Sequence, residues 1–171
     1  MKLRPQKDTI LYGDCRDTIP TIHERVQMCV TSPPYYGLRD YGGESSQIGQ
    51  EQTPEEYIEE LVKVFREVKN VLADDGTLWI NIGDSYYNYR PGKGQSYPKQ
   101  TVSKTKQDLP DKCNKRGNKL QGLKEKDLIG IPWLLAFALR KDGWYLRQDI
   151  IWHKPNPMPE SVKDRCTKSH E

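Results

Sequence analysis

The sequence has few of the residues that build metal sites or disulfide frameworks. Its 171 residues include four cysteines and three histidines. The cysteines are far apart, with no Cys-x-x-Cys pair, and the histidines do not cluster at the spacing of metal ligands. We therefore expect no bound metal and no disulfide framework, and reduced thiols are typical of proteins in the cytosol.

Long hydrophobic runs are also missing. No apolar stretch approaches the roughly 20 residues that a membrane-spanning helix needs, and the N-terminus lacks the apolar core of a signal peptide. These absences predict a cytoplasmic protein that does not bind membranes. The length of 171 residues suits one domain, 1–171, with its own hydrophobic core.

The net charge is only +3, but the charge is unevenly distributed. Between Gly92 and Lys126 there are ten Lys and Arg residues against three Asp and Glu, a local charge of +7 that leaves −4 for the remainder. The slightly wider segment 89–126 has almost no hydrophobic periodicity, so we expect an irregular, basic insertion. Contact with a polyanion such as DNA is the favoured interpretation, and a solvated loop without a partner is the alternative.

Strand and helix patterns alternate along the chain. Apolar, β-branched runs predict strands at 8–12, 26–32, 77–83 and 144–152. Periodic apolar residues predict helices between them, over 15–22, from Thr53 to about 74–76, and from Ile131 to about 141–143. The second helix has a strong start signal, since Thr53, Pro54 and Glu56 fit a capping box with proline in the first turn. This alternation indicates an α/β fold with a parallel sheet.

A rigid turn, Thr31-Ser32-Pro33-Pro34-Tyr35-Tyr36, follows the second predicted strand. Its two prolines fix the backbone and remove two N–H donors, and the residue before each proline is held extended. The carbonyls of Ser32 and Pro33 are therefore left without helical partners, beside an aromatic ring. Such a turn suits a planar group that carries an amine, although an ordinary Pro-Pro turn at the end of a strand is the alternative on these residues alone.

The exocyclic amine of cytosine or adenine would fit this turn. The amine is a poor nucleophile because its lone pair is delocalised into the ring. The Ser32 hydroxyl and the Pro33 carbonyl could accept its two N–H groups and favour a tetrahedral nitrogen. Stacking on Tyr35 would contribute roughly 1–3 kcal/mol, after the base has left the duplex at a cost of about a few kcal/mol.

Two aspartates follow predicted strands, at the edge of a parallel sheet where ligands bind. Asp14 could accept hydrogen bonds from a cofactor, or it could cap the helix that follows it; both roles remain open. Asp84 could support the turn or bind substrate, and a capping role is equally open.

Taken together, these segments resemble the amino-methylating DNA methyltransferases, the N4-cytosine and N6-adenine enzymes. The resemblance depends on 13–15, on the Ser-Pro-Pro-Tyr turn, on 76–86 and above all on 143–156, which reads GWYLRQDIIWHKPN. The catalytic motif comes first in the chain, which is similar to the permuted β-type order. The resemblance implies a partial Rossmann-like class I methyltransferase sheet with helices on both faces, and S-adenosyl-L-methionine as cofactor.

The same resemblance implies roles for individual residues. The catalytic turn would comprise Ser32, Pro33, Pro34 and Tyr35, and the cofactor would contact Asp14 and Ser32. Serine at the first position of the turn looks most like the N4-cytosine branch, since aspartate is usual in N6-adenine enzymes. Residues expected to contact DNA are Tyr36, His153, Lys154, Lys115 and Arg116.

One family motif is missing from the chain. The Phe-x-Gly-x-Gly loop that holds the methionine end of the cofactor has no counterpart here, and Gly92-Lys93-Gly94 does not follow an apolar strand. We therefore expect a piece of a longer enzyme, a truncated gene or half of a split enzyme, with weak or no activity alone. The expected partners are double-stranded DNA, the missing C-terminal portion and a cognate restriction enzyme.

Three further functions stay open at this point. The base could be adenine rather than cytosine. The chain could be a non-catalytic remnant that binds DNA through its basic segment but binds no cofactor. A related turn could also methylate protein or RNA, although the basic segment and the 143–156 block favour DNA.

Overall fold

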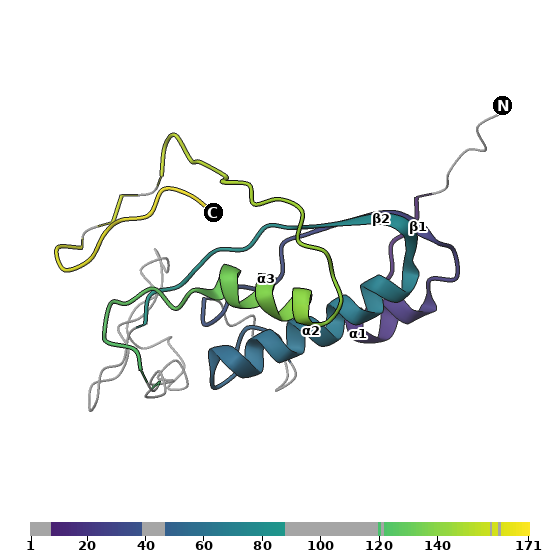
Figure 1. The fold of residues 1–171 in the computed structure, drawn as a ribbon, viewed down its shortest axis with the longest axis horizontal. Coiled ribbons are helices and arrows are strands. Elements are labelled where there is room, and N and C mark those ends of the chain that lie inside the picture. The colour runs from purple at the N-terminus through teal and green to yellow at the C-terminus, as the bar shows by residue number, and fades with distance from the viewer. Residues whose placement is uncertain (1–7, 39–46, 88–119, 121, 158, 161) are drawn as a thin grey trace, which may run out of the picture.

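The computed structural model describes residues 8–38, 47–87, 120, 122–157, 159–160 and 162–171. Its elements follow in the order α1, η1, β1, α2, β2 and α3 (Figure 1). The two strands form a parallel sheet, so the expected α/β class is confirmed. Most of the expected basic insertion, 89–126, lies outside the described residues.

The sheet pairs β1 (Val26–Thr31) with β2 (Leu72–Ile80). β1 confirms the strand expected at 26–32. Cys29 lies opposite Leu78, and both pack against the hydrophobic core. The next pair in the register, Val30 and Trp79, is exposed on the other face, as the alternation of side chains along a strand requires.

Helix α2 (Pro54–Val71) contributes most of the core. The expected capping box is present: the Thr53 hydroxyl accepts a hydrogen bond from the Glu56 backbone N–H, and the Glu56 carboxylate accepts one from the N–H of Thr53. The buried face of α2 packs against α3 (Ile131–Lys141), which confirms the helix expected from Ile131 to about 141–143. The core consists of Tyr57, Ile58, Leu61, Val62, Phe65, Val68, Leu72, Ile131, Leu135 and Leu139.

The boundary between α2 and β2 differs from the expected one. The helix ends at Val71 rather than at 74–76, and the strand begins at Leu72 rather than at Thr77. The guanidinium of Arg25 donates hydrogen bonds to the carbonyls of Asn70 (2.8 Å) and Leu72 (2.9 Å), which stabilises this abrupt change of direction. Residues 74–76 instead fall in an irregular part of the ladder, between the pairs Val26–Leu72 and Met28–Thr77.

The strands expected at 8–12 and 144–152 are not found. Both segments are described and neither forms a strand, and Tyr12 and Tyr145 are 88% and 82% exposed. A strand needs a neighbour that completes its backbone hydrogen bonds, and among the described residues of these two runs such pairing is limited to Trp152, which exchanges backbone hydrogen bonds with Glu171. The short helix expected over 15–22 is present as α1 (Cys15–Thr18) and the 3-10 helix η1 (Ile19–Thr21).

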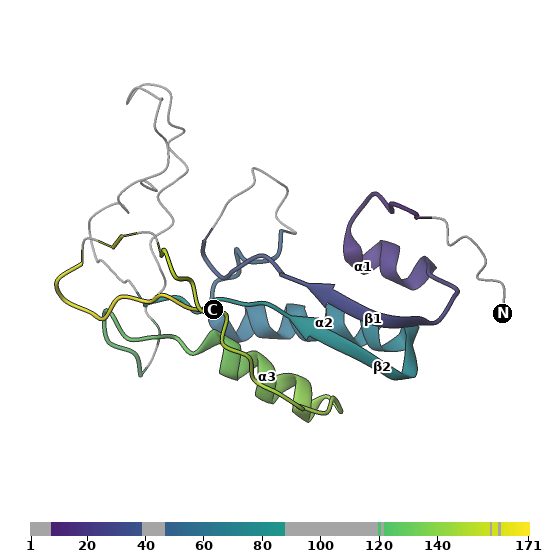
Figure 2. The same ribbon diagram turned by 90° about the horizontal axis from the view of Figure 1, so that it is seen from above.

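The described helices cover one face of the sheet only. Helices α2 and α3 lie together beneath the two strands in Figure 1. Figure 2 looks onto the opposite face, where the strands lie in front of α2. Met28, Val30 and Trp79 are all exposed there. The expected arrangement with helices on both faces is therefore not seen among the described residues.

We expect Thr53→Ala to lower the free energy of unfolding by about 1 kcal/mol, because α2 would lose the hydroxyl that caps its N-terminus. Thr53→Ser keeps a hydroxyl at the same position and should stay close to the parent protein. Urea denaturation measures both variants. Equal stability of the alanine and serine variants would contradict the capping role.

Candidate active site

The Ser32–Tyr35 turn lies at the C-terminal end of β1. The Asn81 N–H donates to the Thr31 carbonyl at 2.9 Å, so pairing between the two chains continues up to the residue before Ser32. Ser32 is exposed and Pro33 is buried. The turn therefore occupies the edge of the parallel sheet at which α/β proteins bind ligands.

A buried tyrosine of α2 forms a hydrogen bond with the backbone of the turn. The Tyr57 hydroxyl donates a hydrogen bond to the Pro34 carbonyl at 2.7 Å, and the Tyr57 side chain is fully buried. Burial raises the pKa of Tyr57, as do the nearby Glu51 and Tyr35, so its hydroxyl keeps its proton and acts as a donor. This hydrogen bond connects the buried face of α2 to the turn.

Tyr35 is half-buried and held at two points. Its hydroxyl donates to Oε2 of Glu171 at 2.8 Å. Its ring packs against the backbone of Gly83, where an added Cβ would come within 2.8 Å of the Tyr35 Cε2 atom. Burial raises the pKa of the Tyr35 hydroxyl; a hydrogen bond with Ser32 lowers it and the one with Glu171 raises it, and the net change is upward.

The Glu171 carboxylate accepts hydrogen bonds from three donors in distant parts of the chain. Besides Tyr35, Oε2 accepts from the Asn81 side-chain amide at 3.2 Å, and Oε1 accepts from the ammonium of Lys154. Burial raises the pKa of Glu171, but the hydrogen bonds from Lys154, Tyr35 and Asn81 lower it by more, so its pKa is below the ordinary value. The carboxylate is therefore ionised at neutral pH.

Sequence reasoning missed two members of this cluster. Asn81 is a polar residue within an apolar run, and that interruption is a signal that could have identified it. Glu171 carries no comparable signal, because 136 positions separate it from Tyr35. Residues 169–171 pair with residues 152–154. Glu171 exchanges backbone hydrogen bonds with Trp152 at 2.7 and 3.0 Å.

Asp84 caps α3, one of the two roles that the sequence leaves open. Its carboxylate accepts hydrogen bonds from the backbone N–H groups of Gly130 and Ile131, each at 3.0 Å, and from that of Ser85. These bonds satisfy N–H groups at the start of the helix, where no side chain of Gly130 could do so. The Lys168 ammonium donates to the Asp84 carbonyl at 3.0 Å.

Asp14 also acts as a helix cap. Its Oδ1 accepts from the backbone N–H of Arg16 at 2.8 Å, and its Oδ2 accepts from the Arg16 guanidinium at 2.6 Å. Hydrogen bonds from the Arg16 side chain and backbone lower the pKa of Asp14 to about 2. A role toward a cofactor would act in addition to this pairing and stays a prediction.

The residues expected to contact DNA differ in their burial and in their neighbours. The Tyr36 ring packs against that of Tyr57 with centroids 5.5 Å apart, so much of Tyr36 faces the protein. Burial, with neighbouring glutamates, raises the pKa of Tyr36 to about 12. His153 is exposed and lies beside the cluster around Lys154. Lys115 and Arg116 lie outside the described residues.

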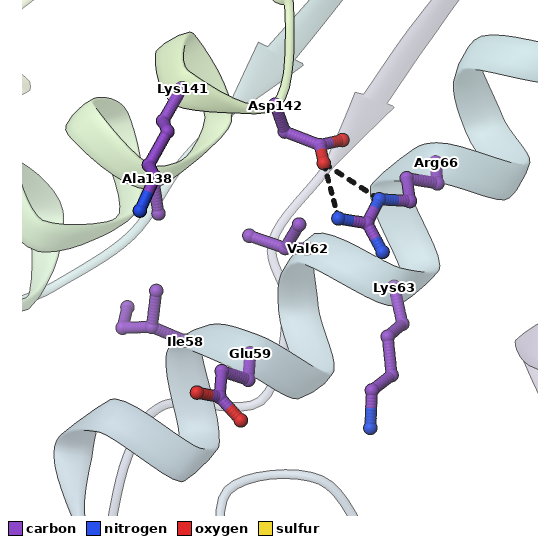
Figure 3. Close-up of a pocket in the computed structure, with 8 residues that line it drawn as sticks. All are labelled: Ile58, Glu59, Val62, Lys63, Arg66, Ala138, Lys141 and Asp142. Carbon is purple, nitrogen blue, oxygen red and sulfur yellow. Dashed lines mark hydrogen bonds and ion pairs between the residues drawn. The ribbon is translucent and has the colours of Figure 1, made fainter.

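A surface hollow of about 440 Å³ lies between α2 and α3 (Figure 3). An ion pair between Arg66 and Asp142, with Nε and Oδ1 2.7 Å apart, crosses one side of it. Its lining consists of Ile58, Glu59, Val62, Lys63, Arg66, Ala138, Lys141 and Asp142. None of these residues belongs to the turn or to the Glu171 cluster, so the hollow is separate from the candidate site.

Comparison with known proteins decides the family. The family model described as DNA methylase matches residues 26–171. The chain belongs to the DNA methylases. This match includes the Ser32–Tyr35 turn and the Glu171 cluster, and it confirms the resemblance to amino-DNA methyltransferases.

Curated relatives support the same assignment. The chain is 50% identical to type II methyltransferase M.SmaI of Serratia marcescens over 168 residues, which is 95% of the chain and 53% of that enzyme. It is 50% identical to M.Cfr9I of Citrobacter freundii and 49% identical to M.XycI of Xanthomonas campestris pv. cyanopsidis, covering 95% and 99% of the chain. The chain thus spans about half the length of these relatives. No solved structure matches it significantly.

Amino-DNA methylases use S-adenosyl-L-methionine as methyl donor, and the sequence predicts contacts to it from Asp14 and Ser32. Both oxygens of Asp14 already accept hydrogen bonds from Arg16. The hollow between α2 and α3 includes neither Asp14 nor Ser32. The roles of Asp14 and Ser32 toward the cofactor therefore remain predictions.

Two other expectations concern metals and membranes. In the part of the chain that the structure describes, no group of three or more His, Cys, Asp or Glu side chains could hold a metal ion. No helix among the described residues is long and apolar enough to cross a bilayer.

We expect Tyr57→Phe to lower the free energy of unfolding by about 1 kcal/mol, because it removes the hydroxyl bound to Pro34 and keeps the buried ring. Tyr145→Phe removes a hydroxyl from a largely exposed ring and is the matched control. Urea denaturation compares the two. A Tyr57→Phe protein as stable as the Tyr145→Phe protein would show that the bond to the turn contributes nothing.

Proposed function

We propose that the chain is the base-binding half of a site-specific DNA methyltransferase that acts on the N4 amine of cytosine. The substrate would be a cytosine flipped out of duplex DNA, and the methyl donor S-adenosyl-L-methionine. The observation that carries the proposal is the Ser-Pro-Pro-Tyr turn at the end of β1, with Ser32 exposed and the Pro34 carbonyl fixed by Tyr57.

In this proposal the turn acts on the target amine directly. The Ser32 hydroxyl and the Pro33 carbonyl accept its two N–H groups, and Tyr35 stacks on the base. Hydrogen bonds to these acceptors strengthen as the amine nitrogen loses its conjugation with the ring. They therefore stabilise the transition state more than the ground state. The cofactor, when bound, supplies an electrophilic methyl group, and no covalent link between enzyme and base is needed.

The remaining half of the fold would complete the cofactor pocket. Relatives named type II methyltransferases are about twice as long as this chain. Met28, Val30 and Trp79 leave an apolar sheet face exposed, which is typical of a surface that another part of a fold covers. We accordingly propose that the complementary half lies against this face, in the same polypeptide or in a separate one.

The other partners follow from the same reasoning. The basic segment 92–126 and the exposed His153 would contact the DNA duplex, together with Lys154, Lys115 and Arg116. A cognate restriction enzyme that reads the same site and a cytoplasmic location are parts of the same proposal, which draws on the likeness to type II methyltransferases. N6-adenine methylation is the closest alternative, since the family includes both amine targets.

The test is mass spectrometry of nucleosides from a methylation-deficient host that expresses the chain with and without the complementary half. We expect 4-methylcytosine only when both halves are present. With both halves, Ser32→Ala should lower kcat about 100-fold, the size typical of losing one hydrogen bond that acts in the transition state.

Other outcomes would change the assignment in defined ways. Appearance of 6-methyladenine would keep the turn and overturn the choice of base. DNA that stays unmodified with both halves present would favour a DNA-binding remnant. Strong methylation by the chain alone would overturn the proposal that half of the cofactor pocket is missing.

A further inference from the structure

We propose that Glu171 is a positioning residue that holds Tyr35 in the orientation required for stacking on the target base. The inference rests on the proposed function, since it concerns the ring that would contact the flipped base. Nothing in the local sequence around Glu171 marks it for this role, and only the folded chain brings it to the turn.

The backbone fixes Glu171 before its side chain acts. Residues 152–154 pair with residues 169–171: the Trp152 N–H donates to the Glu171 carbonyl at 2.7 Å, and the Lys154 N–H donates to the Ser169 carbonyl at 2.8 Å. Figure 2 shows the C-terminal residues beside the segment that continues from β2, where Asn81 lies. The carboxylate therefore approaches Tyr35 from a segment that pairs with residues 152–154.

Two contacts limit the movement of the Tyr35 ring. Its hydroxyl is bound to Glu171 at 2.8 Å, and its edge lies against Gly83, where an added Cβ would stand 2.8 Å from Cε2 and 3.2 Å from Cδ2. A ring fixed at its hydroxyl and at its edge loses little further freedom when a base stacks on it. Preorganisation of this kind increases binding and rate without a new contact to the substrate.

The carboxylate also joins the turn to the His153-Lys154-Pro155 loop. Oε1 accepts from Lys154 while Oε2 accepts from Tyr35, so one group connects a residue proposed to contact DNA with the residue proposed to stack. Asn81 donates to the same Oε2 at 3.2 Å and fixes its position relative to the sheet. Removing the carboxylate would therefore free both Tyr35 and Lys154.

The experiment uses the complete two-half enzyme with two duplexes. An unmodified duplex gives kcat and KM, and a duplex with 2-aminopurine in place of the target base reports flipping and stacking by its fluorescence. We expect Glu171→Ala to lower kcat by about 10- to 100-fold with little change in KM for DNA, and to leave the flipped base brighter because stacking is weaker. Glu171→Gln keeps an amide oxygen that can accept from Tyr35, and should stay within about threefold of the parent enzyme.

A double-variant cycle separates positioning from general stability. Tyr35→Phe removes the other end of the same hydrogen bond, so adding Glu171→Ala to it should lower kcat by much less than in the parent background. Glu160→Gln is the matched control, because Glu160 pairs with Arg165 at 2.7 Å in the same segment and touches no residue of the turn.

Gly83→Ala tests the second contact independently, because the added methyl group would displace the ring from its edge. It should reproduce the brighter 2-aminopurine signal of Glu171→Ala. Additive losses in the cycle, or a loss with Glu160→Gln as large as that with Glu171→Ala, would overturn the role of Glu171 while the methyltransferase assignment stands. An inactive parent enzyme would overturn the proposed function and this role together.

Discussion

The hydrogen bond from the Tyr57 hydroxyl to the Pro34 carbonyl, 2.7 Å long, connects the core to the candidate site. Tyr57 is fully buried, so its ring cannot move without disturbing α2. The two prolines restrict the turn locally, but they cannot fix its orientation relative to the sheet. Tyr57 provides that orientation, and the position of Tyr35 over Gly83 depends on it. The stability of α2, including its capping box, thus contributes directly to the geometry of the site.

Local signals in the sequence were sufficient for several elements. The capping box at Thr53, the helix over 131–141 and the strand ahead of Ser32 all depend on residues close together in the chain, and all three are present. The runs 8–12 and 144–152 also contain β-branched and aromatic residues, but neither forms a strand among the described residues. Propensity describes one chain segment, whereas a strand requires a second one, so these two runs could not be assigned from their own residues.

In the candidate site, too, some residues could be identified from local sequence motifs and others only from tertiary contacts. Ser32 to Tyr35 could be selected from a motif of four residues, and Asp14 and Asp84 from their places after predicted strands. The sequence could not decide between binding and capping for Asp84, because the N–H groups of Gly130 and Ile131 lie more than 40 residues away. Glu171 lay further still from its partner, and only tertiary structure shows it.

One face of the two-stranded sheet is left uncovered by the described residues. Val30 is 70% exposed, and Met28 and Trp79 lie beside it on the same face. Burying a large apolar side chain is worth roughly 1.5–3 kcal/mol, so covering these three would stabilise the fold substantially. The turn directly follows β1, and Val30 of the uncovered face precedes Ser32 by two residues. Any partner that covers Val30 therefore lies close to the Ser32–Tyr35 turn, so the proposed second half would approach the proposed base site as it completes the core.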